Sequence, residues 1–345
     1  MRSFIGDINN TNSTTLPLDL TLFPCDSLLY QPRPVWFLMP ETWQVGYRPM
    51  GKIDVSAFCN DDIKRLVVDI QGWLKNWTKT GCNPFIHSHL YRTRFPGCLQ
   101  IAYTTLSSYI NKTDSNTGII LRVMNEQAGA LIDNKEIRKD GQDESNSITN
   151  TAQFDTLEQL ARVHALLVYQ SIGLFDGDIR FRHLAEGRIS VLDRWTNEMV
   201  ECASRIELPS LTPDLQDFTD ASLSHPFNYN TESTWHTWIL AESARRTWHI
   251  TKGFQSLFSI LQQGQTYCPG GMNFTFRRGM WDASTASEWE TLCSKVDVVF
   301  IKRFEAQDVF NHLSPRDVDE FGTLILETTY GAERMRQWTL EKNVG

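Results

Sequence analysis

The sequence predicts an all-α protein, with one large helical domain of about ten helices behind an irregular, proline-rich N-terminal segment. Three observations support this fold class. Apolar residues recur at helical spacing over several long stretches. Alternating strand-like runs and hairpin turn motifs are scarce. The 345 residues are 41% hydrophobic and 21% charged, which is typical of a globular chain that buries a sizeable core.

Residues 1–59 are expected to form the irregular segment. Prolines interrupt this stretch repeatedly and prevent a continuous helix: Pro17, Pro24, Pro32, Pro34, Pro40 and Pro49. The same stretch contains several aromatic residues, among them Trp36, Phe37 and Trp43. We therefore expect it to pack along the body of the domain, which spans residues 60–345.

The first helices of the domain follow from hydrophobic periodicity. From Asn60, a plausible N-cap, apolar residues fall on one helical face: Ile63, Leu66, Val67, Ile70, Trp73, Leu74 and Trp77. Two further helices are predicted at about 97–109 and 117–132. Residues 133–154 are polar and of mixed charge, with few side chains to bury, so they are predicted to form a surface loop.

After this loop, Asp155 and Glu158 are spaced as in a capping box and open a helix that ends near Asp176. The next helical stretch, about 182–203, is interrupted around Gly187. Residues 205–231 form a connection. A long helix then runs from about 231 to 262, and a loop with Pro269, Gly270 and Gly271 follows. The last predicted helices are 287–310 and 315–330, with Gly331 as C-cap of the second.

Charge and cysteine content exclude several classes of protein. With 33 Lys and Arg against 41 Asp and Glu, the net charge is −8, so the overall field repels phosphate backbones and anionic membranes. We therefore expect no direct nucleic-acid binding and no membrane association. The N-terminus lacks the apolar core of a secretion signal, which predicts an intracellular protein of the nucleus or cytoplasm. The seven cysteines are scattered without a Cys-x-x-Cys pair, so neither a disulfide scaffold nor a zinc ribbon is expected.

His87 and His89, with Cys98 downstream, carry ligand types that zinc favours. The two imidazoles alternate along an extended segment, however, and nothing in the spacing joins the cysteine to them. The alternative is a packed turn around Pro84 in which a histidine caps a helix. We predict no metal and no cofactor for this chain.

Asp176 and Asp178 flank a glycine and, with His164, would supply an acid/base or divalent-metal cluster. The favoured alternative is structural. Such an aspartate pair supplies side-chain acceptors for the free N–H groups of the helix that begins near Ile179, and Arg180 and Arg182 are close enough to pair with the two carboxylates. No catalytic residue is predicted, because the usual enzyme signature motifs are also missing from the sequence.

Glu242, Arg245 and Arg246 lie in the middle of the long predicted helix among tryptophans. Glu242 stands four residues before Arg246, the favourable order for an intrahelical ion pair. If this helix is central, the three side chains form a buried polar network that holds several helices in register.

Several blocks, in order along residues 60–340, resemble the helical regulatory region of fungal binuclear-zinc-cluster transcription factors. They are Pro84–His87, Leu160–Tyr169, Leu174–Arg180, Leu184–Glu186, Trp235–Arg246, Phe274–Trp281 with Trp289, Asp319–Gly322 and Tyr330–Arg334. The resemblance implies an all-α regulatory domain of the fungal-specific transcription factor type.

The sequence departs from this family at its N-terminus. DNA-binding members carry six cysteines that ligate two zinc ions, whereas residues 1–59 hold only Cys25 and Cys59. Zinc and direct promoter recognition are therefore not carried over. The chain is similar instead to stand-alone proteins encoded in fungal gene clusters for secondary-metabolite biosynthesis.

Three functional hypotheses remain open at this stage. The first is an accessory regulator of transcription that works with a DNA-binding transcription factor or senses a small-molecule effector. The second is an enzyme or small-molecule-binding protein of the same pathway that reuses the helical scaffold, with its 11 Trp and 19 Phe lining a pocket. The third is a remnant without activity.

Overall fold

In the computed structural model the fold is described for residues 36–47, 60–139, 148–208, 230–295, 300–303 and 309–343. These residues form 11 α-helices and one two-stranded sheet, which confirms the predicted all-α class. The α-helices are α1 (Asn60–Thr80), α2 (Gly97–Ile110), α3 (Thr117–Lys139), α4 (Ile148–Gly173), α5 (Ile179–Glu186), α6 (Ile189–Ala203), α7 (Thr231–Gln263), α8 (Ala286–Lys295), α9 (Val309–His312), α10 (Glu320–Tyr330) and α11 (Ala332–Asn343).

Helix α7 is the central element of the domain. It begins at the N-cap Asn230, whose side chain accepts a hydrogen bond from Glu232 N, and ends at Gly264, whose φ of +70° gives the left-handed C-cap that glycine favours. All residues of 237–251 are buried. A helix is buried on all sides when other elements surround it, and α7 contacts α1, α4, α6 and α8.

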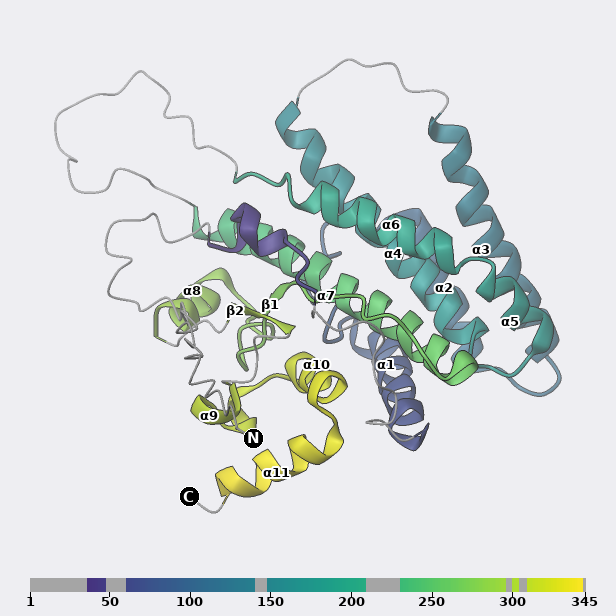
Figure 1. The fold of residues 1–345 in the computed structure, drawn as a ribbon. Coiled ribbons are helices and arrows are strands. Elements are labelled where there is room, and N and C mark those ends of the chain that lie inside the picture. Colours follow the sequence, from purple (N-terminus) through teal and green to yellow (C-terminus); the bar gives the residue numbers. More distant parts are fainter. Residues whose placement is uncertain are drawn as a thin grey trace, which may run out of the picture. The chain divides into compact units, whose positions relative to one another are not determined.

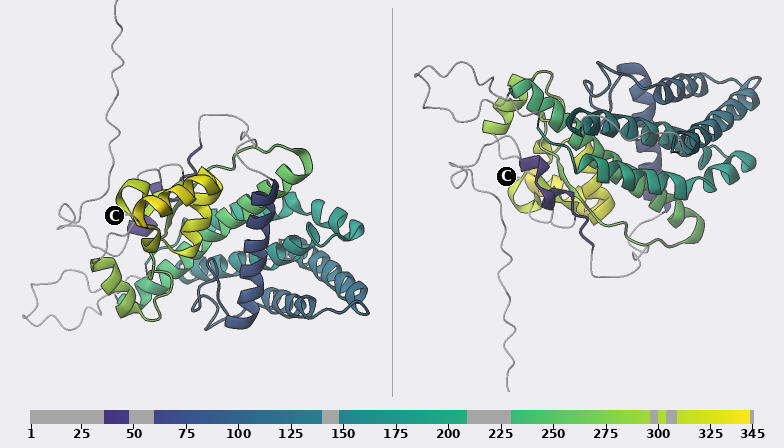
Figure 2. Two further views of the ribbon diagram at one scale, coloured as in Figure 1. Left: turned by 90° about the horizontal axis from the view of Figure 1, so that it is seen from below. Right: turned by 90° about the horizontal axis from the view of Figure 1, so that it is seen from above.

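The other helices lie on either side of α7. Helices α2 to α6 pack together on one side, and α8 to α11 lie on the other (Figure 1). The two further views agree, with the yellow C-terminal helices near the purple segment 36–47 and away from α2 and α3 (Figure 2). Helix α1 packs against both α2 and α7. Elements from distant parts of the sequence therefore converge on the middle of α7.

The predicted single helix 287–310 is wrong. Helix α8 ends at Lys295, and β2 (Phe300–Lys302) pairs antiparallel with β1 (Asn273–Thr275), placing Phe274 opposite Ile301. Ile301 in β2 is β-branched, and such residues favour a strand where a partner strand is available. The short helix α9 follows after residues 304–308.

The predicted loop 133–154 is shorter than the sequence indicated. Helix α3 continues to Lys139 and α4 already begins at Ile148, so Asp155 does not open a helix. Residues 140–147 lie outside the described part of the chain. Polar composition alone therefore does not end a helix at these positions.

The C-terminal end of the domain differs from expectation, whereas the described part of the N-terminal segment agrees with it. Helix α11 was not predicted, and it packs through Trp338, which is fully buried and donates its indole N–H to Leu313 O at 3.3 Å. Within the proline-rich segment, two 3-10 helices, η2 (Trp36–Leu38) and η3 (Pro40–Trp43), bury Phe37 and Trp43. The expected packing of this segment is thus confirmed for residues 36–47. Within the described residues, no helix is both long and apolar enough to cross a bilayer.

Candidate functional site

The middle of α7 carries a buried ion-pair network. Arg246 Nε donates to Glu242 Oε1 at 3.2 Å, and Arg246 Nη2 donates to Asp319 Oδ2 at 2.7 Å. All three residues are buried. Asp319 also caps α10, because its other carboxylate oxygen accepts from Gly322 N at 2.7 Å. The pair therefore joins the central helix to the start of a C-terminal helix.

The Arg246 guanidinium connects further segments. It donates to Pro84 O and to Thr275 O, both at 2.8 Å, and it stacks 4.0 Å from the centre of the Trp281 ring. Charge-assisted bonds of this kind are stronger than neutral ones, and a planar guanidinium can make several at once. One side chain thus fixes α7 against β1, the turn at Pro84 and the N-terminus of α10.

Arg245 holds the N-terminal segment in the same way. Its guanidinium donates to Phe37 O and, at 3.0 Å, to Thr42 Oγ1, and it lies 3.9 Å from the centre of the Trp43 ring. Burial lowers the pKa of Arg245 to about 10, while the Glu242 carboxylate opposes this shift. Arg245 therefore remains charged at neutral pH and binds residues 36–47 to α7.

Glu242 accepts a backbone hydrogen bond from Thr275 N at 2.9 Å. Burial raises the pKa of its carboxyl group, and the charges of Arg246 and Arg245 lower it. The predicted network of Glu242, Arg245 and Arg246 is confirmed by these contacts. Most of its polar atoms bond to protein groups or to one another, as a scaffold requires, whereas Glu242 Oε2, Arg245 Nε and Arg245 Nη1 have no hydrogen-bond partner among the described residues.

The proposed metal ligands do not converge. His87 is buried against the edges of Trp235, Trp238 and Trp281, and its Nδ1 accepts a hydrogen bond from His89 N at 3.1 Å. Burial, followed by the charges of His89 and Arg246, lowers the pKa of His87 to about 3. Across the described residues no three His, Cys, Asp or Glu side chains meet in an arrangement that could hold a metal ion.

Cys98 lies in the first turn of α2, and burial together with the Glu158 charge raises the pKa of its thiol to about 11. His236 on α7, which the sequence did not point to, lies beside His89, with 6.3 Å between the ring centres. His236 and His89 are far apart in the sequence, so local spacing could not predict this contact.

Asp176, Asp178 and His164 lie in three separate environments. Asp176 pairs with Lys112 at 2.6 Å and accepts from the Tyr109 hydroxyl, whereas Asp178 caps α5 by accepting from Phe181 N at 2.7 Å. His164 is buried between the hydroxyls of Tyr91 and Thr247, at 2.8 and 2.7 Å. The capping role predicted for Asp178 is confirmed, and the acid/base cluster is not formed.

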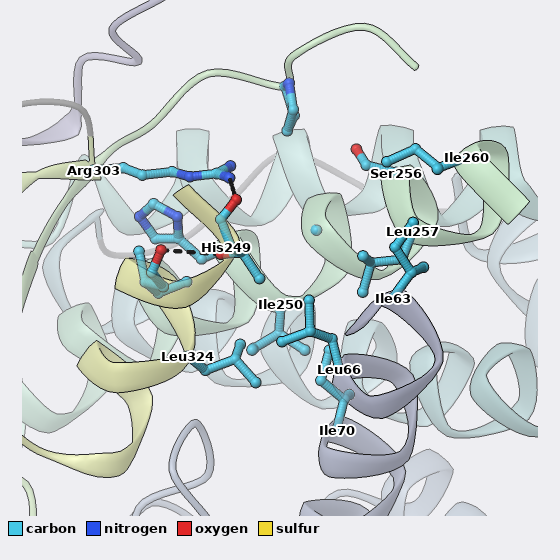
Figure 3. Close-up of a pocket in the computed structure, with 14 residues that line it drawn as sticks. Ile63, Leu66, Ile70, His249, Ile250, Ser256, Leu257, Ile260, Arg303 and Leu324 are labelled. Atoms are coloured by element: carbon cyan, nitrogen blue, oxygen red, sulfur yellow. Dashed lines mark hydrogen bonds between the residues drawn. The ribbon is translucent and has the colours of Figure 1, made fainter. Parts of the chain in front are cut away.

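A small cavity lies between α1, α7 and α10 (Figure 3). Its volume is about 50 Å³. The floor is apolar and buried: Ile63, Leu66, Ile70, Ile250, Leu257, Ile260, Leu324 and Ile325. The rim is only partly buried and includes the more polar Ser256, Arg303 and Thr328.

One end of the cavity is polar. His249 and Arg303 lie together there (Figure 3), and His249 Nε2 donates to Met272 O at 3.0 Å, which leaves Nδ1 as an acceptor. Burial, with the positive charges of Arg303 and Arg246, lowers the pKa of His249 to about 3. Arg303 donates to Thr329 Oγ1 at 2.7 Å and to Thr328 O at 3.0 Å. At neutral pH the positive charge at this end therefore comes from Arg303.

Gly253 lies on the wall that α7 contributes to the cavity. A Cβ atom at this position would have no neighbour within 4 Å, so neither packing nor backbone conformation requires glycine. In contrast, a Cβ at Gly322 would lie 2.5 Å from Phe276 Cβ. A glycine inside a helix costs roughly 0.5–1 kcal/mol relative to alanine, and an empty 50 Å³ cavity costs about 1 kcal/mol at ~24 cal/mol per Å³. Both costs are small beside the total free energy that stabilises a domain.

Comparison with known proteins identifies a relative among curated sequences. The chain is 26% identical over 267 residues to Transcription factor gsfR2 of Penicillium aethiopicum. The alignment covers 76% of this chain and 58% of the relative, so the chain spans less than two thirds of that protein's length. No protein-family model and no solved structure matches the chain. By sequence, the all-α chain is thus similar over most of its length to a fungal transcription factor.

Proposed function

We propose that this chain is a transcription-regulating module that acts through a DNA-binding partner. The observation that carries the proposal is the similarity to a transcription factor over 76% of the chain. The net charge of −8 supports action through a partner, because it opposes contact with the phosphate backbone of DNA. The buried network on α7 supports a scaffold role, since its charged groups bind other parts of the protein.

A second candidate is a small-molecule-binding protein or enzyme of a fungal secondary-metabolite pathway that uses the same scaffold. The cavity between α1, α7 and α10 favours the binding form of this candidate, because its floor is apolar and polar side chains lie at one end. Sensing of a small effector by a regulator would unite the two candidates. The link to a metabolite gene cluster, and a nuclear location, are further parts of the proposal.

Deletion of the gene in its host, with profiling of transcripts and metabolites, tests the proposal. We expect the levels of a defined set of transcripts to change, and the intact gene to restore them. A change in metabolites with unaltered transcripts would contradict the regulator and favour the pathway protein. Unaltered transcripts and metabolites would contradict both candidates.

A gel-shift selection with purified protein tests the need for a partner. The protein alone should retain no particular sequence from a pool of random DNA duplexes at physiological salt. Specific retention of one sequence motif by the protein alone would contradict action through a partner. Salt must be kept constant across the comparison, because phosphate contacts weaken steeply as salt rises.

A further inference from the structure

We propose that residues 36–47, the strap, cover a docking site that a partner protein occupies with an acidic, aromatic peptide segment when the strap moves away. This strap site consists of Arg245 on α7, Trp289 on α8, and Phe300 and Lys302 on β2. The identity of the partner as a protein of transcription rests on the proposed function. The exchange of the strap for a peptide is a property of the purified chain.

Two aromatic contacts hold the strap on its site. Phe37 is fully buried and meets the Trp289 ring edge to face, with 6.5 Å between the ring centres. Trp36 meets the Phe300 ring in the same way at 4.9 Å. Figure 1 shows the strap in purple against α7. The strap therefore fills its site with alternating main-chain and aromatic contacts, as a bound peptide does.

The strap has few main-chain bonds to the rest of the domain. Gly46 and Gly271 exchange two hydrogen bonds of 2.8 Å, and Arg245 donates to Phe37 O. Among the residues that the structure describes, the strap main chain makes no other hydrogen bond outside itself. A segment held mainly by its side chains opens while the helices beneath it stay folded, because local opening costs less than global unfolding.

Arg245 is the first of two cations that receive no opposite charge from the strap. Its Nη2 donates to Thr42 Oγ1 at 3.0 Å, but its Nε and Nη1 have no hydrogen-bond partner in the described part of the chain. The Glu242 carboxylate stays 3.9 Å from Nη1, and its other oxygen is bonded to Arg246 Nε and Thr275 N. An aspartate in the place of Thr42 would bring a carboxylate to Arg245, and charge-assisted hydrogen bonds are roughly twice as strong as neutral ones.

Lys302 is the second cation, and it lies beside the other end of the strap. Within the described residues it has no ion-pair partner. A Cβ atom at Gly46 would lie 3.5 Å from Lys302 Cδ, which is an ordinary contact distance, and the φ angle of Gly46 is not in the left-handed region. A residue with a side chain therefore fits at this position, and a glutamate there would pair with the Lys302 ammonium group.

These contacts define the peptide that fits the strap site. Phe37 and Trp43 are six positions apart, and the two cations lie beside positions 42 and 46. A matching partner segment carries two aromatic residues at this spacing and carboxylates at those two positions. Alternating acidic and hydrophobic residues are typical of activation segments of transcription proteins. The closed strap competes as a tethered ligand, so the partner binds in proportion to the fraction of chains that are open.

Fluorescence anisotropy of labelled peptides, titrated with the full-length protein, tests the exchange. The strap peptide has the sequence of residues 36–47, and the acidic peptide is the same sequence with Thr42→Asp and Gly46→Glu. In the protein, the double variant Phe37→Ala/Trp43→Ala weakens the strap and leaves the strap site intact. Met39→Ala is the matched control, because Met39 belongs to the strap but is 40% exposed.

We expect the acidic peptide to bind the double variant at least about tenfold more tightly than it binds the wild type or Met39→Ala, since both of these keep the strap closed. Equal affinity for the three proteins, or no saturable binding to the double variant, would overturn the proposal. Circular dichroism melts establish that each variant is folded. If the double variant is unfolded, Thr42→Ala takes its place and should give a smaller gain, and no gain would overturn the proposal.

Lys302→Gln, added to the strap-weakened protein, tests the acidic character of the peptide. Without this change the acidic peptide should bind about tenfold more tightly than the strap peptide. Lys302→Gln should reduce this preference about threefold and leave the affinity for the strap peptide within about twofold. Equal binding of the two peptides before the change, or an equal loss for both after it, would overturn the acidic assignment.

The peptide assay and the deletion strain fail separately. Anisotropy needs neither a promoter nor a DNA-binding partner. Peptide exchange together with an unaltered transcript profile would contradict the proposed function alone, and an altered transcript profile without peptide exchange would contradict the strap alone.

Discussion

Arg246 Nη2 lies 2.7 Å from Asp319 Oδ2, and both groups are buried. The contact joins residues 73 positions apart in the sequence. Arg246 comes from the middle of the central helix and Asp319 from the N-cap of α10, so a helix cap and a buried ion pair share one carboxylate. The C-terminal part of the domain is held to α7 by this shared group.

Arg246→Met should destabilise the domain strongly, because it leaves Asp319 buried without its cation and leaves Glu242 with Arg245 alone, at 3.9 Å. Breaking a buried pair on one side costs about 3–5 kcal/mol. Urea unfolding followed by circular dichroism measures the loss. Arg336→Met is the matched control, since Arg336 pairs with Glu333 on the exposed surface and its removal should leave the midpoint unchanged. Equal midpoints for the Arg246 variant and the wild type would contradict the role of the network.

Arg245→Met should release the N-terminal segment. The variant loses the hydrogen bonds to Phe37 O and Thr42 Oγ1 and the stacking on Trp43. Limited proteolysis with mass spectrometry should then show cleavage within residues 36–47 at a protease concentration that leaves the wild type intact there. If the segment is cut at the same rate in both proteins, Arg245 does not hold it.

Gly322→Ala and Gly253→Ala should change stability in opposite directions. At Gly322 the new Cβ would lie 2.5 Å from Phe276 Cβ and 2.9 Å from Val318 Cγ1, so overpacking should cost about 1–3 kcal/mol. At Gly253 the methyl group enters open space, and the better helix propensity should stabilise the protein by roughly 0.5–1 kcal/mol. Thermal melts of the two variants against the wild type measure both effects. A rise in Tm for Gly322→Ala would refute the packing described for α10.

Acid should destabilise the domain through its buried histidines. Burial lowers the pKa of His87, His164 and His249 from 6.5 to about 3, so between these values the unfolded chain binds protons that the folded chain does not. Stability is therefore full above about pH 6.5 and falls as the pH drops toward 3, by up to about 1.4 kcal/mol per pH unit for each histidine.

Urea midpoints at pH 7.5, 6 and 5 measure this slope. His164→Gln should remove about a third of it, because one of the three histidines is lost. A free energy of unfolding that is constant from pH 7.5 to pH 5 would show that the three imidazoles accept protons in the folded state.

A bound water molecule should bridge Glu242 and Arg245. Glu242 Oε2 and Arg245 Nη1 are 3.9 Å apart, and neither atom has a hydrogen-bond partner in the described part of the chain. Buried polar atoms of this kind are commonly satisfied by an ordered water. A crystal structure that resolves solvent should show density between the two atoms. A dry, direct contact shortened to hydrogen-bond distance would exclude the bridging water.

The sequence predicted those features that depend on local patterns. The limits of α7 and the ion pair from Glu242 to Arg246 could be predicted from helical spacing. The cap at Asp178 could be predicted because this aspartate directly precedes a helical stretch. The partner of Arg246 on α10 did not follow, because nothing in local spacing relates positions 246 and 319. The strand β2 was missed for the same reason, since its conformation depends on pairing with β1.

The sequence also did not predict the cavity. Its walls come from α1, α7 and α10, which are far apart in the sequence, and only the packed structure brings them together. The contact between His89 and His236 likewise arises from tertiary packing. Conversely, Asp176 and His164 are close in the sequence, but they bond to different partners, Asp176 to Lys112 and His164 to Tyr91 and Thr247.

Tethering the full chain to an unrelated DNA-binding domain upstream of a reporter gene tests its proposed role in transcription most directly. A regulatory module should change reporter output several-fold relative to the DNA-binding domain alone, and Arg246→Met, which destabilises the fold, should abolish the change. Reporter output equal to that of the DNA-binding domain alone, from a fusion shown to be folded and nuclear, would contradict a role in transcription.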